Sequence, residues 1–406
     1  MAFAVGTLPK VWHKKISRII LSPGIALNEA WLAPFRQAGI EIIGDIELFA
    51  RSISQPVIAV TGSNGKSTVC TLVSEFLQQG GYQVGLGGNI GTPVLDLLLD
   101  EVEHDVYVLE LSSFQLETTY SLHSISSALL NISEDHMDRY SSLAEYLQAK
   151  TSIYNDTELA VVPQGEDARL WLTHNTAKVH FGLQPPLDEQ DYGLAQIGDT
   201  RWLVRGQQPY VALDMMHLNA PHHQLNALAA MALCQPFALA PEVFAQVLAQ
   251  FSGLAHRTQL VCEHQGVRWV NDSKGTNVGA TLAALSSLAQ GLKGGKIILL
   301  AGGVGKDADF SPLLEPLNLY AKQLILFGRD APRIRQALND GLSIDCCEVT
   351  DLQQAVAQAQ HSAEPGDMVL LSPACASFDQ FSDYRQRGEQ FVAWVEQLAS
   401  ATPENS

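Results

Sequence analysis

The chain has 406 residues, of which 46% are hydrophobic and 17% are charged, and its formal net charge is −18. This length suggests two or three domains, and the ordinary globular composition argues against long disordered regions. The negative charge argues against a nucleic-acid-binding surface. The six cysteines show no metal or disulfide spacing, and no apolar run reaches the roughly 18 residues of a membrane span. We therefore expect a cytoplasmic protein without a membrane span or a nucleic-acid partner.

Residues 1–54 predict only a fragment of an α/β unit. Strand-like residues occur at 19–21 and 40–43, and a helical stretch lies between them at 31–37. A segment this short buries too little apolar surface to be comfortably stable alone. We interpret it as an incomplete N-terminal domain.

Strands and helices alternate regularly from Val57 onward. An apolar run at 57–60 precedes a glycine loop, and the helical apolar pattern that follows the loop closes on Gly80. Further strands are predicted at 82–86, 106–109 and 125–130. This alternation predicts a mainly parallel sheet, in which ligands bind at the carboxyl ends of the strands.

The pattern changes between residues 175 and 213, where short strands separated by glycine and polar turns predict a small antiparallel insertion. Two helices are expected next, at 226–233 and 241–251. Beyond Gly253 a second doubly wound α/β domain is predicted. Its expected strands are 267–270, 296–300, 323–327 and 368–371, and its expected helices are 278–289, 331–338, 352–361 and 385–398. The predicted domains are therefore residues 1–54, 55–253 and 254–406.

The stretch Thr61–Thr68 (TGSNGKST) lies between a strand and a helix, which is the context of a phosphate-binding loop. Its glycines allow backbone N–H groups to converge on an anion, the helix N-terminus adds partial positive charge, and Lys66 neutralises the outer phosphates. Ser67 would hold a magnesium ion. The full pattern has a glycine where this chain has Val60, so the loop is a shortened form. The alternative is an ordinary Gly/Asn turn into a helix.

Three further candidates carry chemistry. Glu110 ends a buried strand and could ligate magnesium together with Ser67; otherwise it caps a helix or pairs with an arginine. His136 lies among acidic residues in a loop, where it contacts a metal or substrate or forms structural hydrogen bonds. Lys150, in a helix that opens with the capping box at 142–145, would by itself be interpreted as part of a solvated helix face.

Polar loops also follow strands in the last part of the chain. Arg257 and the stretch 271–277 combine basic with small polar residues, which suits phosphate or carboxylate recognition. A second glycine loop carries Lys306, and Ser372–Ser377 follows the last strand. Their common position at strand ends predicts one site that faces the central nucleotide loop.

Together these motifs resemble the Mur ligases of peptidoglycan synthesis. The resemblance is carried by Thr61–Thr68, Gly88–Gly91 (GNIG), Glu110–Glu117 (ELSSFQLE), Glu134–Arg139 (EDHMDR), Ala255–Arg257 (AHR), Asn271–Asn277 (NDSKGTN) and Leu371–Phe381 (LSPACASFDQF). The glycine-lysine loop alone is also shared with folylpolyglutamate synthases. The resemblance implies a three-domain α/β architecture, with an N-terminal domain for a UDP moiety, a central ATPase domain and a C-terminal Rossmann-like domain that brings an amino acid.

The resemblance also implies a reaction, because the motifs are most similar to those of members that add D-glutamate to UDP-N-acetylmuramoyl-L-alanine (UDP-MurNAc-L-Ala). ATP phosphorylates the substrate carboxylate, and the amine of D-glutamate then displaces phosphate from the acyl phosphate. Catalysis is then mostly positioning and charge neutralisation. The alternatives are another Mur or folylpolyglutamate-type ligase, and a nucleotide-binding remnant without ligase activity. A monomer is expected.

Residue roles follow from the resemblance by position. The expected catalytic residues are Lys66, Glu110, His136 and Lys150. ATP is expected at Gly62, Ser63, Asn64, Gly65, Lys66, Ser67, Thr68, Asn226, Arg257 and Asp272. The UDP-MurNAc-L-Ala substrate is expected at Ser22, Pro23, Gly24, Asn89, Ser112, Gln115 and His136, and D-glutamate at Thr276, Lys306, Ser377 and Tyr384. Two Mg²⁺ ions are implied, one at Ser67 and Glu110 and one at His136 and Lys150, with Lys150 N6-carboxylated into an anion.

Three departures from the family pattern bear on substrate binding. The family usually begins with a complete βαβ unit that carries a glycine-rich turn and an arginine for the UDP, and this sequence starts after that unit. His223 stands where the family commonly has Asn, and Tyr384 stands where it usually has Phe. We therefore expect altered contacts at the UDP and adenine ends, and tolerance of Tyr384 where its hydroxyl reaches water or a polar group.

Overall fold

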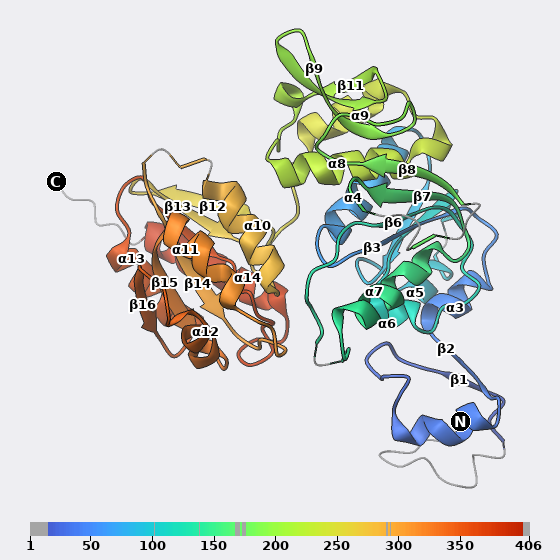
Figure 1. Cartoon of the computed structure of the whole chain (residues 1–406), viewed down its shortest axis with the longest axis horizontal. Helices are drawn as coiled ribbons and strands as arrows, with labels where there is room; N and C mark the ends of the chain where they lie inside the picture. Colours follow the sequence, from blue (N-terminus) through green and yellow to red (C-terminus); the bar gives the residue numbers. More distant parts are fainter. Residues whose placement is uncertain are drawn as a thin grey trace. The chain divides into compact units, whose positions relative to one another are not determined.

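The computed structural model describes residues 15–100, 102–137, 139–166, 171–172, 176–289, 291–292 and 294–400. The chain divides into two compact units (Figure 1). The first comprises Met1–Ile132, Ala144–Asn219 and His223–Phe251, and the second comprises Ser133–Leu143, Ala220–His222 and Ser252–Ser406. Across the part of the chain that the structure describes, no helix is long and apolar enough to span a membrane.

The first described elements form a small two-stranded sheet. Strand β1 (Arg18–Ile20) pairs in parallel with β2 (Glu41–Ile43). The connection between them contains the 3-10 turn η1 (Ala30–Leu32) and helix α2 (Ala33–Gln37). The two strands and the helix therefore lie where the sequence predicted them, as a fragment of an α/β unit. Helix α3 (Asp45–Ala50) follows and packs on the next sheet.

A nine-stranded sheet forms the centre of the first unit, in the order β11-β10-β9-β8-β7-β6-β3-β5-β4. Its strands are β3 (Val57–Thr61), β4 (Val84–Gly88), β5 (Val106–Glu110), β6 (Ser124–Leu129), β7 (Thr157–Pro163), β8 (Ala177–Phe181), β9 (Tyr192–Ile197), β10 (Thr200–Arg205) and β11 (Gln208–Ala212). All neighbours from β4 to β9 pair in parallel, and β9, β10 and β11 pair antiparallel. The predicted antiparallel segment is therefore confirmed for β9–β11, which extend this sheet at one edge, whereas β8 belongs to its parallel part.

Helices cover both faces of this sheet. On one face, Ile58 and Val60 of β3 share a core with α4 (Lys66–Gln79), α8 (Pro221–Leu233) and α9 (Pro241–Gln250). On the other face, the alternate β3 side chains pack with α3, with α5 (Val94–Leu97) and with the turn η2 (Ser152–Tyr154). Burial on both sides explains why β3 is a continuous apolar run with no polar alternation.

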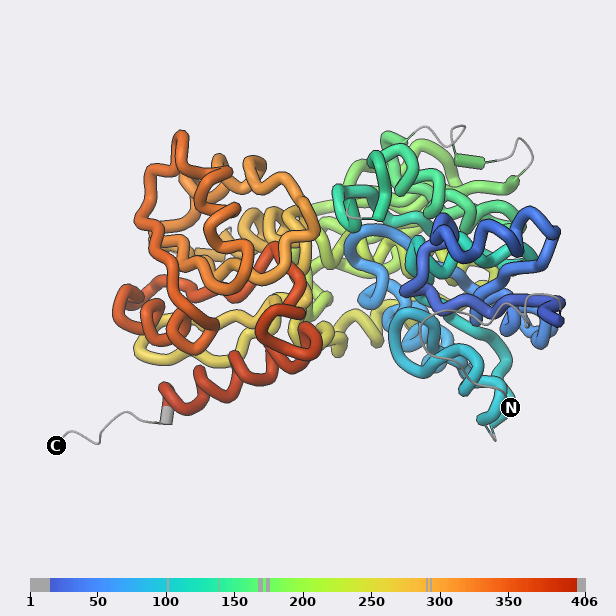
Figure 2. Tube along the Cα trace, turned by 90° about the horizontal axis from the view of Figure 1, so that it is seen from below, coloured from blue at the N-terminus to red at the C-terminus, as the bar shows by residue number. Residues whose placement is uncertain are grey.

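The second unit contains a six-stranded sheet in the order β12-β13-β17-β14-β15-β16. Its strands are β12 (Gln259–His264), β13 (Val267–Asn271), β14 (Ile297–Gly302), β15 (Ala321–Phe327), β16 (Asp345–Glu348) and β17 (Met368–Leu371). Only β12 pairs antiparallel among them. One face packs against α10 (Val278–Ala289), α11 (Leu314–Tyr320) and α12 (Ala331–Leu338). The other face packs against α13 (Leu352–Ser362) and α14 (Tyr384–Ser400), and Figure 2 shows α14 running beside β12 and β13. This arrangement is the predicted doubly wound fold.

Two edge strands and one α-helix of the second unit were not predicted from the sequence. Strand β16 has the sequence DCCE, which lacks apolar alternation because the strand lies at an edge and its side chains are only partly covered. Strand β12 is the opposite edge and is likewise only partly buried. Helix α11 carries Pro316 in its first turn, where proline is tolerated but where the sequence reads as a breaker.

The last residue of β14, at position 302, must be glycine. Gly302 has a φ of 139°, and a methyl group there would overlap the carbonyl oxygen of Phe327 on the neighbouring strand. By contrast, Gly366 has a φ of 100°, and a methyl group there would meet nothing nearer than 4.0 Å.

Replacing Gly302 with Ala is therefore expected to lower the free energy of unfolding by about 3 kcal/mol or more, because backbone strain and steric overlap add. Gly366→Ala, which adds the strain without the overlap, is expected to cost about 1 kcal/mol. Urea unfolding of the two variants and the parent chain measures both values. Equal losses for the two variants would show that the overlap with β15 is relieved at no cost.

Candidate active site

The glycine loop joins β3 to α4 and is held by its own lysine. Gly62 and Gly65 have φ values of 150° and 84°, in the range that favours glycine, and α4 begins at Lys66. The Lys66 Nζ donates to the carbonyl oxygens of Gly62 (2.8 Å) and Ser63 (2.9 Å). A positive charge thus lies against the N-terminal end of a 14-residue helix, which is a place where phosphate oxygens are attracted.

Two asparagines support this loop. Asn131, just after β6, accepts from the Asn64 backbone N–H at 2.9 Å through Oδ1 and donates to the Asn64 carbonyl at 3.0 Å through Nδ2. On α8, Asn226 packs so closely that a methyl group at Gly65 would come within 2.7 Å of its Oδ1. Asn226 was predicted at the ATP site. Asn131 was not predicted. The feature that could have indicated it is an amide side chain just after the end of a predicted strand.

Ser67, Glu110 and Asn89 form a chain of hydrogen bonds behind the loop. The Ser67 hydroxyl donates to Glu110 Oε2 at 2.6 Å, and the Asn89 amide donates to Glu110 Oε1 at 2.9 Å. The Glu110 carboxylate is buried at the end of β5. A hydroxyl and a carboxylate side by side are hard oxygen ligands, and magnesium in nucleotide sites needs few such groups from the protein. These two residues therefore fit the predicted magnesium site.

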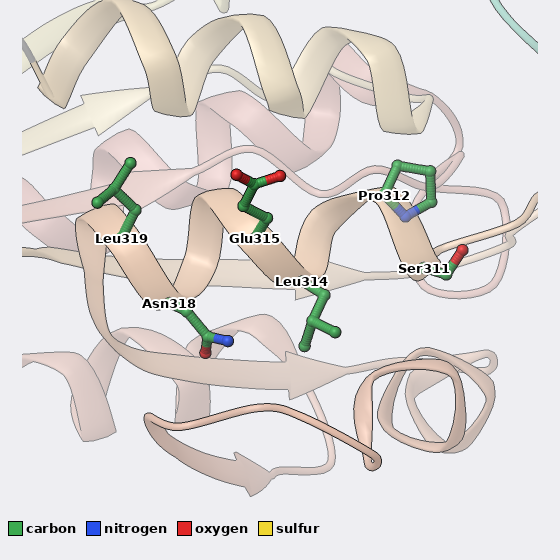
Figure 3. A pocket seen from close by; sticks show the side chains of 6 residues that line it. All are labelled: Ser311, Pro312, Leu314, Glu315, Asn318 and Leu319. Carbon is green, nitrogen blue, oxygen red and sulfur yellow. The ribbon is translucent and has the colours of Figure 1, made fainter.

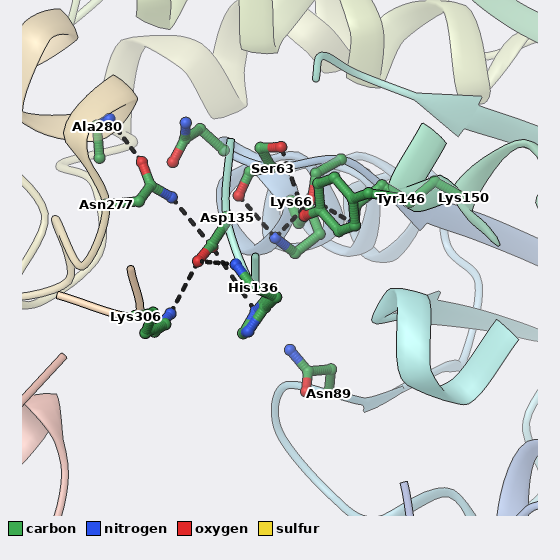
Figure 4. Close-up of polar contacts among 12 residues, drawn as sticks. Ser63, Lys66, Asn89, Asp135, His136, Tyr146, Lys150, Asn277, Ala280 and Lys306 are labelled. Atoms are coloured by element: carbon green, nitrogen blue, oxygen red, sulfur yellow. Dashed lines mark hydrogen bonds and ion pairs between the residues drawn. The ribbon is translucent and has the colours of Figure 1, made fainter. Parts of the chain in front are cut away.

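Lys150 is buried at the end of α7 (Leu143–Thr151), so it is not part of a solvated helix face. Its Nζ donates to Thr61 Oγ1 (3.2 Å) and to the Gly62 carbonyl (2.9 Å), the oxygen that Lys66 also contacts. Its Nζ also lies 4.8 Å from the ring centroid of Tyr146 (Figure 4). An ammonium group has no lone pair for a metal, so Lys150 fits a metal site only after carboxylation of its amine.

The turn at Ser112–Leu116 follows β5 directly. Ser112 caps α6 (Ser113–Leu116) in a capping box, in which its hydroxyl accepts from the Gln115 N–H at 3.2 Å and Gln115 Oε1 accepts from the Ser112 N–H at 3.0 Å. The capping box thus brings the two predicted substrate residues together, just after the strand that ends at Glu110. Ser22, Pro23 and Gly24 lie in the bend after β1, closed by a bond from the Ile25 N–H to the Ser22 carbonyl at 2.9 Å.

In the second unit, Asp135 links two loops. Its carboxylate accepts from Lys306 Nζ at 2.8 Å and from Asn277 Nδ2 at 3.2 Å (Figure 4). Burial by itself would raise the pKa of Asp135, but the charges of Lys306 and His136 and the hydrogen bonds from Lys306 and Asn277 lower that pKa to about 2. His136 has a φ of 58°, and its Nε2 lies 3.7 Å from Asp135 Oδ2. Lys306 is a predicted residue, whereas its partnership with Asp135 was missed.

Asp272, at the end of β13, is buried and accepts from Ser372 Oγ at 2.7 Å and from the Thr258 N–H at 3.1 Å. Its burial raises the pKa of this carboxyl to about 6, although both hydrogen bonds and the charge of Arg257 oppose the shift. The predicted residues Asp272 and Arg257 are therefore close enough for the charge of Arg257 to act on the Asp272 carboxyl group.

Loops 271–277 and 372–377 are joined by Arg387, which the sequence analysis missed. Its buried guanidinium donates to Ser273 Oγ (3.0 Å), to the Ser273 carbonyl (2.7 Å) and to the Cys375 carbonyl (3.0 Å). Burial lowers its pKa to about 10. An arginine within the long helix α14 gives no sequence signal of such a role.

The predicted D-glutamate residues lie on or beside these loops. Thr276 is in the first loop, and Ser377 is buried at the end of the second. Tyr384 begins α14, and Lys274 Nζ lies 4.0 Å from the centroid of its ring. Tyrosine therefore serves as an aromatic partner for a cation at this position.

The predicted residues divide between the two units. Those in the first unit are Ser22–Gly24, Gly62–Thr68, Asn89, Glu110, Ser112, Gln115, Lys150 and Asn226. Those in the second are His136, Arg257, Asp272, Thr276, Lys306, Ser377 and Tyr384. Asp138, in the motif around His136, lies outside the described residues. Among the described residues, no group of three or more His, Cys, Asp or Glu side chains is gathered as for a metal ion.

A surface hollow of about 560 Å³ lies elsewhere, along α11 (Figure 3). It is lined by Ser311, Pro312, Leu314, Glu315, Asn318 and Leu319. None of the predicted site residues lines this hollow. Its polar lining residues are Glu315, Ser311 and Asn318, and this set does not indicate a catalytic site.

Comparison with protein families and solved structures identifies the chain. The Mur ligase middle domain matches residues 60–234, and the Mur ligase glutamate ligase domain matches residues 256–375. Solved structures give the fold: MurC from Thermotoga maritima has a TM-score of 0.64 at 18% identity, covering 94% of this chain and 84% of that one. MurF from the same organism, in complex with ADP, has a TM-score of 0.65 at 18% identity, covering 95% and 88%.

Relatives with higher identity extend over nearly the whole chain. The UDP-N-acetylmuramoylalanine--D-glutamate ligase of Hydrogenovibrio crunogenus is 53% identical over 401 residues, which are 98% of this chain and 88% of that protein. The enzyme of the same name from Alcanivorax borkumensis is 45% identical, covering 97% and 87%. The chain therefore belongs to the Mur ligase family, in the group formed by the UDP-N-acetylmuramoylalanine--D-glutamate ligases.

Proposed function

We propose that this protein uses ATP to join D-glutamate to UDP-MurNAc-L-Ala, forming an amide and releasing ADP and phosphate during peptidoglycan precursor synthesis. The observation that carries the proposal is the hydroxyl-carboxylate pair of Ser67 and Glu110, 2.6 Å apart, directly behind a glycine loop that Lys66 contacts. These residues are suited to bind a nucleoside triphosphate and its magnesium ion. The two other substrates, the carboxylic acid and the amine, are inferred from the names of the relatives.

The reaction proceeds in two steps, phosphorylation of the carboxylate and displacement of phosphate by the amine. A carboxylate oxygen of the L-alanyl group attacks the γ-phosphorus of ATP and breaks its bond to the β–γ bridging oxygen, which leaves with ADP. The ammonium group of D-glutamate first loses one proton, and the resulting amine attacks the acyl carbon. The bond from that carbon to the phosphate oxygen breaks, and a second proton passes from the nitrogen to the departing phosphate. The first step gives a poor electrophile a good leaving group, and the protein contributes positions and charges.

The residues of the first unit have distinct tasks in this scheme. Lys66 and the loop N–H groups hold and neutralise the phosphates as charge moves onto them. Ser67 and Glu110 would hold Mg²⁺, which would supply positive charge to neutralise the phosphates. Asn89, which follows β4 and donates to Glu110, would meet the muramoyl-alanine substrate together with Ser112 and Gln115.

The remaining assignments are part of the same proposal. His136 and a carboxylated Lys150 would hold a second Mg²⁺. Arg257 and Asp272 would contact the nucleotide, and Thr276, Lys306, Ser377 and Tyr384 would hold D-glutamate, with Lys306 as a point charge for a carboxylate. The domain functions would be UDP binding in 1–54, ATP binding in 55–253 and amino-acid binding in 254–406. The enzyme would act as a cytoplasmic monomer.

The function is tested by ADP release, which is expected only when UDP-MurNAc-L-Ala and D-glutamate are both present with ATP and magnesium. A coupled assay measures it, with each substrate omitted in turn and with L-lysine, diaminopimelate or folate offered in place of the cognate partner. Turnover with one of these replacements, or none with both cognate substrates, would contradict the proposal.

Replacing Lys66 with Ala is expected to lower kcat by about a hundredfold or more, because a positioned charge on the transferred phosphoryl group is lost. The matched control is Lys178→Ala, which removes an exposed lysine of β8. Circular dichroism should show the same fold for both variants. Activity of Lys66→Ala close to that of the control would remove Lys66 from the phosphate site.

Replacing Lys150 with Ala is expected to lower activity by about tenfold or more. Adding acetate or formate should restore part of the activity, because a small carboxylate can take the place of the lost carbamate. Lys66→Ala serves as the comparison, since its missing charge is positive and no carboxylate can replace it. Steady-state rates across a carboxylate titration give the result. If neither acetate nor formate restores activity to the Lys150→Ala variant, the result would count against carboxylation of Lys150.

A further inference from the structure

A buried carboxylate on α3 lies behind the predicted substrate turn. The Glu47 side chain is fully buried, and its two oxygens accept four hydrogen bonds. Oε2 accepts from the backbone N–H groups of Tyr120 (2.7 Å) and Ser121 (2.9 Å). Oε1 accepts from the Ser121 hydroxyl (2.7 Å) and from Arg51 Nε (2.7 Å). Although burial raises the pKa of a carboxyl group, the bonds from Tyr120 and Ser121 leave the pKa of Glu47 below its ordinary value.

The segment that Glu47 holds has little support of its own. Residues 119–123, between α6 and β6, have no regular secondary structure. A second contact adds to the hydrogen bonds of Glu47: the N–H of Gly44, just before α3, donates to the Thr118 carbonyl at 3.1 Å. A methyl group at Gly44 would overlap the Thr118 hydroxyl, so the two backbones approach closely.

From this segment, bonds lead back to the substrate turn. The Gln115 carbonyl accepts from Thr119 Oγ1 at 2.8 Å and from Thr118 Oγ1 at 3.3 Å. Gln115 in turn closes the capping box with Ser112. At its other end the turn is fastened to the glycine loop, because Thr61 Oγ1 donates to the Leu111 carbonyl at 2.7 Å. The turn is therefore fixed at one end by β3 and at the other by Glu47.

We propose that Glu47 is a positioning residue, which orients the Ser112–Gln115 turn for the muramoyl-alanine substrate through its bonds to Tyr120 and Ser121. The proposal rests on the proposed function, in which Ser112 and Gln115 meet that substrate. Glu47 acts from behind the turn, so its effect is specific to one of the three substrates. ATP and D-glutamate bind to other loops.

The test variant is Glu47→Gln, which keeps the shape of the side chain but turns one acceptor oxygen into a donor amide. We expect the KM for UDP-MurNAc-L-Ala to rise about tenfold, with the KM values for ATP and D-glutamate unchanged within about twofold. Hydrogen exchange at the amides of Tyr120, Ser121 and Leu116 should accelerate in the free protein. The control is Glu364→Gln, which breaks the ion pair of an exposed carboxylate with Lys322 and should change neither readout.

Ser121→Ala, which deletes one hydroxyl, should shift both readouts in the same direction by less, and it decides the matter if Glu47→Gln does not fold. Unchanged exchange at Leu116, or equal increases in all three KM values, would overturn the positioning role. If the parent chain shows no ligase turnover, the proposed function fails, and hydrogen exchange alone then decides whether Glu47 orders the turn.

Discussion

The backbone between Gly62 and Lys66 curls into a loop in which carbonyl oxygens face a lysine ammonium, and much of the first unit supports that conformation. The Asn131 side chain pairs with the backbone of Asn64, and Asn226 leaves no room for a side chain at Gly65. A loop supported in this way requires little reorganisation to receive an anion. Preorganised charge is where most of the catalytic advantage in phosphoryl transfer arises.

Two positive charges share one carbonyl in this region, because Lys66 and Lys150 both donate to the oxygen of Gly62. Lys150 is buried, and its second bond goes to Thr61 at the end of β3. In the proposed metal site, carboxylation would replace the positive charge of Lys150 with a negative one and so end its repulsion with Lys66.

The second unit holds its polar loops by a different means. Asp135 ties the loop of Lys306 to Asn277, and Arg387 ties Ser273 to Cys375. Arg387 is fully buried and the Asp135 side chain is only 11% exposed, and each satisfies backbone or side-chain groups from distant parts of the chain. Removal of one partner would leave the other charge uncompensated, which is costly inside a protein.

Local patterns in the sequence explain what could be predicted. The apolar run of β3 is recognisable because both faces of that strand are buried, and the glycine loop is recognisable because a strand and a helix flank it. Edge strand β16 has no such pattern because it is only partly covered. The partnership of Asp135 with Lys306 spans 171 residues, and that of Glu47 with Ser121 spans 74. Neither distance leaves a trace in local periodicity, so ion pairs and positioning residues emerged only with the structure.

In the proposed reaction, ATP held at the phosphate loop activates a carboxylate by transferring a phosphoryl group to it. The most direct measurement uses UDP-MurNAc-L-Ala labelled with ¹⁸O in the alanyl carboxylate and follows the label into inorganic phosphate by mass spectrometry. If the acyl phosphate forms, each phosphate released during amide formation carries one oxygen from that carboxylate. Release of unlabelled phosphate at the same rate as amide formation would show that the carboxylate is not phosphorylated.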